Sequence, residues 1–433
     1  MTIQEPTPPM PTSPPTLTNI GGIFNYKWES ENVQIILERL REDSRRTVTA
    51  DIRITAQPEG HIHMTRLNLL ATRSRNEVAR YARERCQRNR DWDAIIEQLC
   101  VMTLDLYREG EPVVNLGEVQ PSPEPIFRLR PFIVEGEATI LYGEGGIGKS
   151  MVAAMMAGLV DQNYSTSTCQ PMPGKVLYLD FETTADIAAR RFQGITRGFG
   201  FGGSSNVIYR FCHQSLPADI GEIQRIVAEH NVDLIIVDSA GPACGGDPES
   251  AASAISYFTA LRSLRKASVT IAHRSKGGSV GPFGSVYWVN YPRMAYELKK
   301  SQEEESDEMH VALIHRKVND GRLQAPQAFC IRWHEGGAVT VKAEEMAEVA
   351  EFIDELPIAD QCAIAIRDNG PRTVKELSEI TGLQARSVSV VLSRSRSRFN
   401  KVGNQQWDNV RPSLNLETPD PHGTGFRCAC KPI

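Results

Sequence analysis

The stretch Ala138-Thr139-Ile140-Leu141-Tyr142-Gly143-Glu144-Gly145-Gly146-Ile147-Gly148-Lys149-Ser150-Met151 decides the fold of the largest part of the chain. An apolar strand at residues 138–142 runs directly into the pattern Gly-x-x-x-x-Gly-Lys-Ser, and an Ala- and Met-rich helix follows at once. In this order of elements, backbone N–H groups converge on phosphate oxygens at a helix N-terminus. We therefore predict that residues 143–151 bind ATP, with Lys149 at the β- and γ-phosphates and Ser150 on Mg²⁺.

Length and composition set broad limits. The 433 residues suffice for two or three domains, and a net charge of −5 does not by itself indicate a nucleic-acid partner. The longest apolar run, residues 151–160, has about half the length of a membrane-spanning helix, so we expect no membrane segment. The N-terminus lacks a basic region followed by an apolar stretch, which favours a cytoplasmic location.

The nine cysteines are scattered, mostly in apolar contexts, as is typical of reduced and packed thiols. Cys428 and Cys430 lie near His422 and form a lone C-x-C. Such a pair can take part in a metal site, but a second pair at a recognisable spacing is missing.

Changes in composition divide the chain. The first 22 residues are rich in proline, serine and threonine, which predicts a disordered tail because little apolar surface can be buried. Apolar residues at helical spacing predict helices at 33–40 and 92–106, whereas residues 48–54 alternate as a strand does. The predicted parts are a tail at 1–22, an α+β accessory domain at 23–120, an α/β domain at 127–343, a C-terminal domain at 345–415 and a tail at 416–433.

A helix predicted around residues 75–90 is rich in arginine. The acids Glu77, Glu84, Asp91 and Asp93 partly balance this charge. The balance favours a solvated helix face over a contact with nucleic acid.

Short apolar strands alternate with helical stretches from residue 127 to 343, which is typical of a mostly parallel sheet wrapped by helices. The fold class is therefore α/β. The strands are predicted at 138–142, 175–180, 207–211, 234–238, 269–273, 294–298 and 311–316, with a terminal hairpin at 329–333 and 338–341.

Polar residues end several of these strands. Asp238 ends the buried strand 234–238, where a carboxylate can reach the hydration shell of Mg²⁺. Glu182 follows the strand 175–180, which we expect beside the phosphate-loop strand, and is our candidate general base for the attacking water. Asp180, one step further back, is its rival. His273 ends the strand expected beside Asp238 and is a candidate sensor of the γ-phosphate.

In this order, the segments 143–150, 177–182, 234–238 and 273–276 resemble the plasmid RepA-type hexameric helicase ATPases of the RecA/DnaB superfamily. Residues 284–293 are similar to that family's Gly-Ser segment leading to an arginine, and 316–321 to its Lys-x-Asn-x-Gly turn. The resemblance covers about half of the chain, from about residue 127 to 342, and implies a RecA-like P-loop core.

The resemblance also implies roles and partners. In that family ATP lies between subunits of a ring, the glutamate matching Glu182 is the catalytic base, and the arginine matching Arg293 completes a neighbour's site. Arg316 and Lys317 are the alternatives that DnaB-like members suggest. A homo-oligomer, most simply a hexamer, is therefore expected.

A predicted helix with a capping box of Thr373 and Glu376 ends at a glycine turn, and a second helix follows at 384–398. With residues 399–407 as a β wing, this pattern indicates a winged helix-turn-helix. Basic residues outnumber acids in 372–411, as contact with DNA phosphates requires, although a protein-binding winged helix is the alternative. The predicted DNA contacts are Arg386, Ser387, Ser389, Arg394 and Lys401.

Together these features predict an ATP-hydrolysing motor acting on single- or double-stranded DNA in the replication or remodelling of a mobile element. The alternative is an ATP-dependent DNA-binding switch that assembles without translocating.

Overall fold

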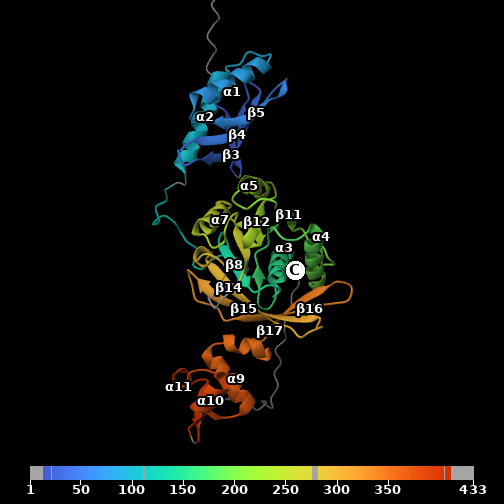
Figure 1. The fold of residues 1–433 in the computed structure, drawn as a ribbon, viewed down its shortest axis with the longest axis vertical. Coiled ribbons are helices and arrows are strands. Elements are labelled where there is room, and N and C mark those ends of the chain that lie inside the picture. The colour runs from blue at the N-terminus through green and yellow to red at the C-terminus, as the bar shows by residue number, and fades with distance from the viewer. Residues whose placement is uncertain (1–12, 21, 111–112, 276–280, 404, 411–433) are drawn as a thin grey trace, which may run out of the picture. The chain divides into compact units, whose positions relative to one another are not determined.

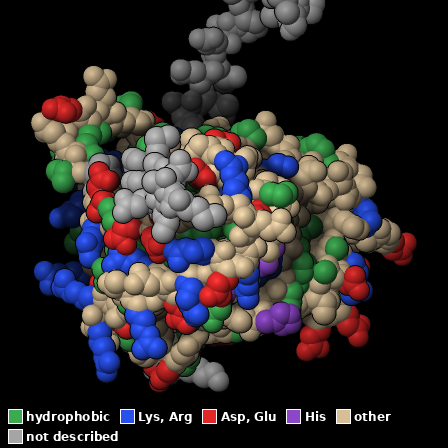
Figure 2. Space-filling model, turned by 90° about the horizontal axis from the view of Figure 1, so that it is seen from above, with side chains coloured by type: hydrophobic (Ala, Val, Ile, Leu, Met, Phe, Trp, Pro, Cys, Tyr) green, Lys and Arg blue, Asp and Glu red, His purple; other side chains and the backbone are tan. Residues whose placement is uncertain are grey.

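The computed structural model describes residues 13–20, 22–110, 113–275, 281–403 and 405–410 (Figure 1). The chain divides into two compact units, Met1–Glu345 and Met346–Ile433. Within the described ranges, no helix is both long and apolar enough to cross a membrane. On the face seen in Figure 2, Lys and Arg side chains are interspersed with Asp and Glu, in keeping with the small net charge of −5.

The first elements form an antiparallel sheet with the order β1-β2-β3-β4-β5, and two helices follow it. Tyr26, Trp28, Ile35, Trp92 and Ile96 are among the buried residues that join the sheet to the helices. The bounds are β1 Thr16–Ile20, β2 Ile23–Trp28, β3 Val33–Glu42, β4 Val48–Ala56, β5 Gly60–Asn68, α1 Thr72–Arg85 and α2 Trp92–Glu109.

Two sequence predictions are wrong in this part. Residues 33–40 form most of β3, in which Val33, Ile35 and Leu37 are buried and alternate with partly exposed neighbours. The run fits both a period of 3.6 and a period of 2, and pairing with β2 and β4 selects the strand. Strand β1 lies inside the predicted disordered tail. The segment forms a strand because it pairs along its length with β2 and because Leu17 packs on the core.

Three arginines of α1, Arg75, Arg80 and Arg83, form ion pairs with nearby acids. Arg75 lies 2.7 Å from Glu97, and Arg83 pairs with Asp93. These contacts favour the prediction of a solvated helix face.

The central sheet has nine strands in the order β11-β10-β12-β13-β8-β14-β15-β16-β17. From β11 to β14 the neighbours are parallel, and from β14 to β17 they are antiparallel. The predicted α/β fold class is therefore confirmed, including the terminal hairpin. The bounds are β8 Ala138–Gly143, β10 Lys175–Asp180, β11 Ile208–Phe211, β12 Val232–Asp238, β13 Ala267–His273, β14 Met294–Ser301, β15 Glu308–Val318, β16 Gln327–Trp333 and β17 Val339–Glu344.

Helices cover both faces of this sheet. Side chains alternate along its buried strands, so apolar side chains on each face need a layer of helices to bury them. Leu141 packs with α3 and α4 on one face, whereas Ile140 packs with α5, α7 and α8 on the other. The bounds are α3 Lys149–Gln162, α4 Ala185–Gly198, α5 Ile220–Glu229, α6 Ala240–Ala243, α7 Ala251–Ser263 and α8 Tyr287–Asn290. A small sheet of β6 Phe127–Arg130, β7 Ile133–Val134 and β9 Gln170–Pro171 lies beside this core.

The antiparallel strands bend around α3 until β17 packs on α4 (Figure 1). The approach is so close that a Cβ atom on Gly198 would lie 1.9 Å from the carbonyl oxygen of Val339. Glycine is therefore required at this position of α4. The bend carries residues of β15 and β16 to the far side of the phosphate loop.

The predicted neighbour of the phosphate-loop strand is wrong. Strand β8 lies between β13 and β14, and β10 is separated from it by β12 and β13. Each of these strands is buried on both faces along its middle, so the sequence has no pattern that orders them.

The second unit begins with the short 3₁₀ helices η1 Met346–Glu348 and η2 Ala350–Glu355. Three helices and an antiparallel sheet of order β18-β20-β19 then enclose a core that includes Leu377, Val388, Leu392, Phe399 and Trp407. The bounds are α9 Ile358–Asn369, β18 Arg372–Thr373, α10 Val374–Thr381, α11 Ala385–Arg394, β19 Phe399–Val402 and β20 Gln406–Asn409.

The capping box predicted at the start of α10 is present, since Thr373 N donates to Glu376 at 2.7 Å and Glu376 N donates to Thr373 Oγ1 at 3.3 Å. Helix α11 ends at Arg394, earlier than the predicted residue 398, because the chain turns there to bury Phe399 at the start of β19. Residues 411–433, with His422, Cys428 and Cys430, lie outside the described residues, and so does Lys276.

Candidate functional site

The predicted phosphate loop joins β8 to α3 with its backbone turned toward a cleft. Gly146 and Gly148 have φ angles of 72° and 84°, which glycine adopts without strain. Lys149 is buried, and its Nζ donates to the carbonyl oxygens of Gly143 at 3.1 Å and Glu144 at 2.5 Å. The loop therefore holds its lysine folded over its own backbone, beside the N-terminus of α3.

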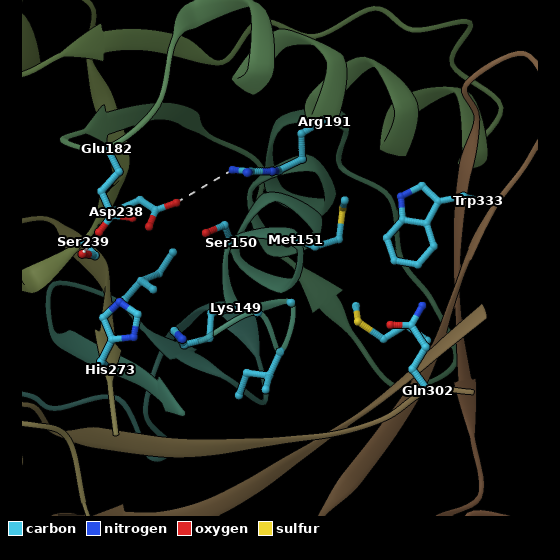
Figure 3. Close-up of a pocket in the computed structure, with 15 residues that line it drawn as sticks. Lys149, Ser150, Met151, Glu182, Arg191, Asp238, Ser239, His273, Gln302 and Trp333 are labelled. Atoms are coloured by element: carbon cyan, nitrogen blue, oxygen red, sulfur yellow. Dashed lines mark hydrogen bonds and ion pairs between the residues drawn. The ribbon is translucent and has the colours of Figure 1, made fainter. Parts of the chain in front are cut away.

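The cleft has a volume of about 390 Å³ and is lined by residues from several strands and from helices α3 and α4 (Figure 3). Lys149, Ser150 and Met151 stand in its middle, with Glu182, Asp238 and His273 at one end. The lining residues are Gly146, Ile147, Gly148, Lys149, Ser150, Met151, Glu182, Arg191, Asp238, Ser239, Ile271, His273, Gln302, Met309 and Trp333.

Asp238 is the buried carboxylate at this end of the cleft, and residues of neighbouring elements contact it. It ends β12 and is only 4% exposed. Its side chain accepts a hydrogen bond from Tyr178 Oη at 2.5 Å, Arg191 Nη1 lies 3.8 Å away, and the nearby Ser150 hydroxyl acts to lower its pKa. A serine and an aspartate in contact at a helix N-terminus are oxygen donors suited to Mg²⁺, so these residues fit the ion that the phosphate loop implies.

Burial sets the protonation of the two central groups. Desolvation lowers the pKa of Lys149, while the negative charges of Asp238 and Glu182 act against that shift. Desolvation also raises the pKa of Asp238, against the hydrogen bonds from Tyr178 and Ser150 and the charge of Arg191. Each shift comes mainly from removing a charge from water, and an anionic ligand with its cation would restore the missing partners.

The two rival acids after β10 have different environments. Asp180 is fully buried and accepts hydrogen bonds from the backbone N–H groups of Glu182 and Thr183, both at 2.9 Å, and from the Thr183 hydroxyl. Glu182 lies in the bend after β10, is exposed, lines the cleft and accepts a hydrogen bond from Ser239. Asp180 therefore holds the turn that presents Glu182, and Glu182 is the acid with access to a ligand.

His273 is the last residue of β13 and lies directly beside Gly143 in the sheet register. The next residue, Arg274, donates its backbone N–H to the Gly143 carbonyl at 2.9 Å. As predicted, β13 also neighbours β12, which ends in Asp238. A ligand that displaces His273 would therefore also displace Arg274 and, through its hydrogen bond, the first residue of the phosphate loop.

The sequence did not predict the opposite end of the cleft. Trp333 from β16 and Gln302 after β14 lie there, across from Glu182 and His273, and Met151 and Met309 add thioethers to the wall (Figure 3). Arg191 of α4 was also missed. It follows another arginine on an ordinary amphipathic helix, and no pattern distinguishes it from Arg190.

Three predicted cations are absent from the lining of this cleft. Arg293 precedes β14 at the amino-terminal edge of the sheet, where its N–H donates to Ala138 O at 2.9 Å and its side chain is 3.5 Å from Glu137 and 3.7 Å from Asp320. Since β8 rises about 3.3 Å per residue, Arg293 is roughly 20 Å from its own phosphate loop. The side chain is 44% exposed.

Arg316 and Lys317 of β15 are bound by groups of their own chain. Arg316 lies 2.7 Å from the buried carboxylate of Glu297. Lys317 Nζ donates to the carbonyl oxygens of Val289, Asn290 and Pro292 at 2.6 to 2.8 Å, and burial followed by the charge of Arg293 lowers its pKa. These bonds fix Lys317 at the end of α8.

In the second unit, the predicted DNA contacts lie on α11 and in the hairpin. Arg386, Arg394 and Lys401 are exposed, whereas Ser387 and Ser389 are partly buried. Lys401 Nζ lies 5.7 Å from the centroid of the Trp407 ring.

Comparison with known proteins supports the ATPase core. Residues 108–279 match the family described as an AAA domain, which is less than half of the 433 residues. The crystal structure of a KaiC-like protein from the hyperthermophilic archaeon Pyrococcus horikoshii OT3 is 13% identical over 51% of this chain and 99% of that chain, with a TM-score of 0.37. At this level the likeness has no bearing on function. None of the curated proteins that were searched matches the chain.

The AAA-domain match covers the phosphate loop, Glu182, Asp238 and His273. Together with the strand order, it supports the assignment of residues 143–150 as the phosphate loop of a mostly parallel α/β domain.

The position of Trp333 leads to a test of how the nucleotide lies. We expect the base to pack on this ring while the phosphates meet the loop, because an aromatic contact adds about 0.5–1.5 kcal/mol beyond the area that it buries. Trp333→Ala should then weaken ATP binding about tenfold, which is about 1.4 kcal/mol, and leave inorganic triphosphate binding unchanged. Titration calorimetry measures both ligands, and Trp333→Phe is the control that keeps a ring. An equal loss for both ligands would show that Trp333 supports the fold and not the base.

Proposed function

We propose that this protein is an ATP-hydrolysing, DNA-binding motor of the RepA/DnaB helicase type, acting in the replication or remodelling of a mobile element. The observation that carries the proposal is the meeting of Lys149, Ser150, Asp238, Glu182 and His273 in one cleft. These side chains come from four elements, and together they supply the groups that hydrolysis of a nucleoside triphosphate needs.

The chemistry assigns one task to each group. Water attacks the γ-phosphorus, the bond to the β–γ bridging oxygen breaks, and ADP leaves with that oxygen. Glu182 accepts the proton of the attacking water, since it is exposed to the cleft and held by Ser239. Lys149 offsets phosphate charge, and Ser150 with Asp238 would hold Mg²⁺, which neutralises charge on the phosphates when bound.

The second unit is the proposed DNA reader. Its three helices followed by a hairpin have the element order of a winged helix, with α11 as the recognition helix. The basic side chains of Arg386, Arg394 and Lys401 are exposed to phosphates.

We further propose a ring, most simply of six copies by the family resemblance, in which Arg293 completes the site of a neighbour. Two observations support this assignment. Arg293 is half exposed and at the sheet edge opposite its own phosphate loop, whereas Arg316 and Lys317 are bound to buried groups of their own subunit. A cation that acts in trans must be free to leave its own partners, and Glu137 and Asp320 are distant enough for that.

A switch that binds DNA and assembles in response to ATP, without translocation, is the proposal's rival. The same cleft and the same second unit would serve it. Strand separation on a forked DNA substrate distinguishes the two, because only a translocating motor couples turnover to unwinding.

The catalytic assignment is tested with variants of Lys149 and Glu182, and a variant of Asp180 serves as a comparison. Lys149→Ala should lose ATP hydrolysis by a factor on the order of 10² or more, because the phosphates lose a preorganised cation. Glu182→Gln should keep ATP binding and lose hydrolysis, since an amide cannot take the proton of water. Turnover is followed by phosphate release, and binding by calorimetry.

Asp180→Asn is the matched comparison for the acid. Because Asp180 accepts backbone hydrogen bonds in the turn, its amide variant should lower thermal stability and reduce turnover less than Glu182→Gln does. If Asp180→Asn is the inactive variant and Glu182→Gln hydrolyses ATP normally, the base is wrongly assigned.

DNA binding is tested through its salt dependence. The double variant Arg386→Ala/Arg394→Ala should lower the slope of log affinity against log salt for duplex DNA by about 2, because two fewer counterions are released. Deletion of residues 346–433 should flatten the slope further while ATPase activity survives. Arg367→Ala is the control, because this exposed arginine of α9 pairs with its neighbour Asp368. An unchanged slope in the double variant would favour a protein-binding second unit.

The trans arginine is tested by mixing subunits. Arg293→Ala should reduce turnover by a factor on the order of 10³ with little change in ATP binding. When it is mixed with Lys149→Ala, some interfaces pair an intact loop with an intact arginine, so activity should partly return. If mixed oligomers form and nothing returns, Arg293 does not act in trans. The same mixing with Arg316→Ala or Lys317→Ala tests the two alternatives.

A further inference from the structure

The antiparallel strands β15, β16 and β17 have one face toward the core and one face away from it. Met309, Val311, Phe329 and Ile331 alternate inward and join the cluster around α3. Their neighbours in sequence point to the opposite face, because side chains alternate along a strand. That opposite face carries a compact group of residues with nitrogen, sulfur and oxygen donors, outside the ATP cleft.

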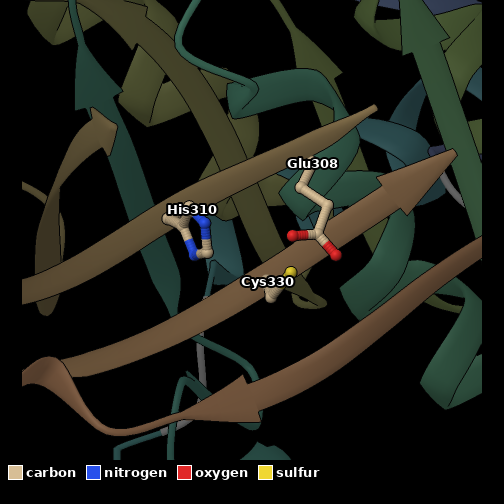
Figure 4. Close-up of side chains that lie close together, drawn as sticks. All are labelled: Glu308, His310 and Cys330. Atoms are coloured by element: carbon tan, nitrogen blue, oxygen red, sulfur yellow. The ribbon is translucent and has the colours of Figure 1, made fainter. Parts of the chain in front are cut away.

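Glu308 and His310 of β15 and Cys330 of β16 form the group (Figure 4). His310 and Cys330 are directly opposite each other in the antiparallel register, and Glu308 is two residues along from His310 on the same face. One donor atom from each of the three lies within 4.8 Å of the other two, and all three residues are partly buried. In a tetrahedral zinc site the donors are about 3–4 Å apart, so small side-chain rotations bring them into range.

A fourth residue orients the histidine. His310 Nδ1 lies 2.8 and 2.9 Å from the two carboxylate oxygens of Glu344 on β17. With the Nδ1 proton directed to a carboxylate, the lone pair of Nε2 is left for a ligand. A histidine whose second nitrogen is held by a carboxylate is the usual arrangement at metal centres. The glutamate is only 13% exposed, so this contact is largely shielded from water.

Two basic residues border the group, and their charges match the two carboxylates of Glu308 and Glu344 without an ion. Arg332 pairs with Glu308, and Lys342 is paired with Cys330 in the register of β16 and β17. The Arg332 side chain is 55% exposed and Lys342 is exposed, so both can turn to water when a cation enters. Displacing them costs little, because exposed ion pairs contribute little to stability.

We infer that Glu308, His310 and Cys330 form a binding site for a zinc-class divalent cation, with Glu344 as the positioning residue for His310. The thiolate and imidazole donors select zinc or a similar transition metal over Mg²⁺, which prefers oxygen ligands. Three protein ligands leave a coordination position for water or for a ligand from outside. The ion ties β15 to β16, and through Glu344 to β17, the last strand before the second unit.

The test uses the full chain, freed of metal by chelation and titrated with Co²⁺, whose thiolate complexes absorb in the near ultraviolet. We expect a saturable Co²⁺–thiolate band at one ion per chain, which Zn²⁺ abolishes by displacement. Cys330→Ser should remove the band. Glu344→Gln should keep it but weaken Co²⁺ affinity by roughly 10- to 100-fold, as loss of such an orienting partner does.

Matched controls identify the source of the signal. Cys86→Ser removes a cysteine of the same intermediate burial that is distant in sequence, follows α1 and packs on the core of the first sheet, and it should leave the band unchanged. The pair Cys428→Ser/Cys430→Ser should also leave it unchanged. The inference is overturned if no saturable band forms, if the band survives Cys330→Ser, or if it is lost with Cys428 and Cys430. Far-ultraviolet circular dichroism confirms that each variant is folded. His310→Gln removes a second proposed ligand and should therefore also abolish the site.

Discussion

Burial of Asp238 at the carboxyl end of β12 is the constraint on which the ATP cleft depends. A carboxylate that is 4% exposed is costly unless its oxygens have partners. Here the partners come from three elements, Tyr178 on β10, Ser150 on α3 and Arg191 on α4. One buried charge thereby fixes the start of α3 against the sheet and places Lys149 beside it. The phosphate loop is held in position by helix α3 and by the ends of the neighbouring strands, and not by its glycines alone.

The bend of the antiparallel strands around α3 is the second determinant. It depends on close contact between α4 and β17, for which Gly198 leaves room. Because of this bend, Trp333 and Met309 face the cleft although neither belongs to the parallel half of the sheet. The same alternation that turns Met309 inward turns Glu308 and His310 outward. Two neighbouring residues of β15 thus contribute to sites on opposite faces of one strand.

Charged residues outside the cleft also have defined partners. Glu297 is buried and pairs with Arg274 and Arg316, so it joins the end of β13 to β15 behind the phosphate loop. Lys317 holds the carbonyl groups at the end of α8. Arg293 has longer and more exposed contacts than either Arg316 or Lys317. The environment of each cation, and not its place in a motif, distinguishes Arg316 and Lys317, which are bound to buried groups, from the more exposed Arg293.

The sequence by itself determined the strands of the ATPase core, the loop from Gly143 to Ser150 and the end of β12 at Asp238, because apolar runs and glycine spacing are local signals. It did not decide β3, since its apolar residues fit two periods, and only pairing with its neighbours selected the strand. The order of the central strands, the burial that separates Asp180 from Glu182, and the arrival of Arg191 and Trp333 at the cleft were decided by tertiary structure alone. These features depend on contacts between residues far apart in the chain, and a pattern read along the sequence carries no record of such contacts.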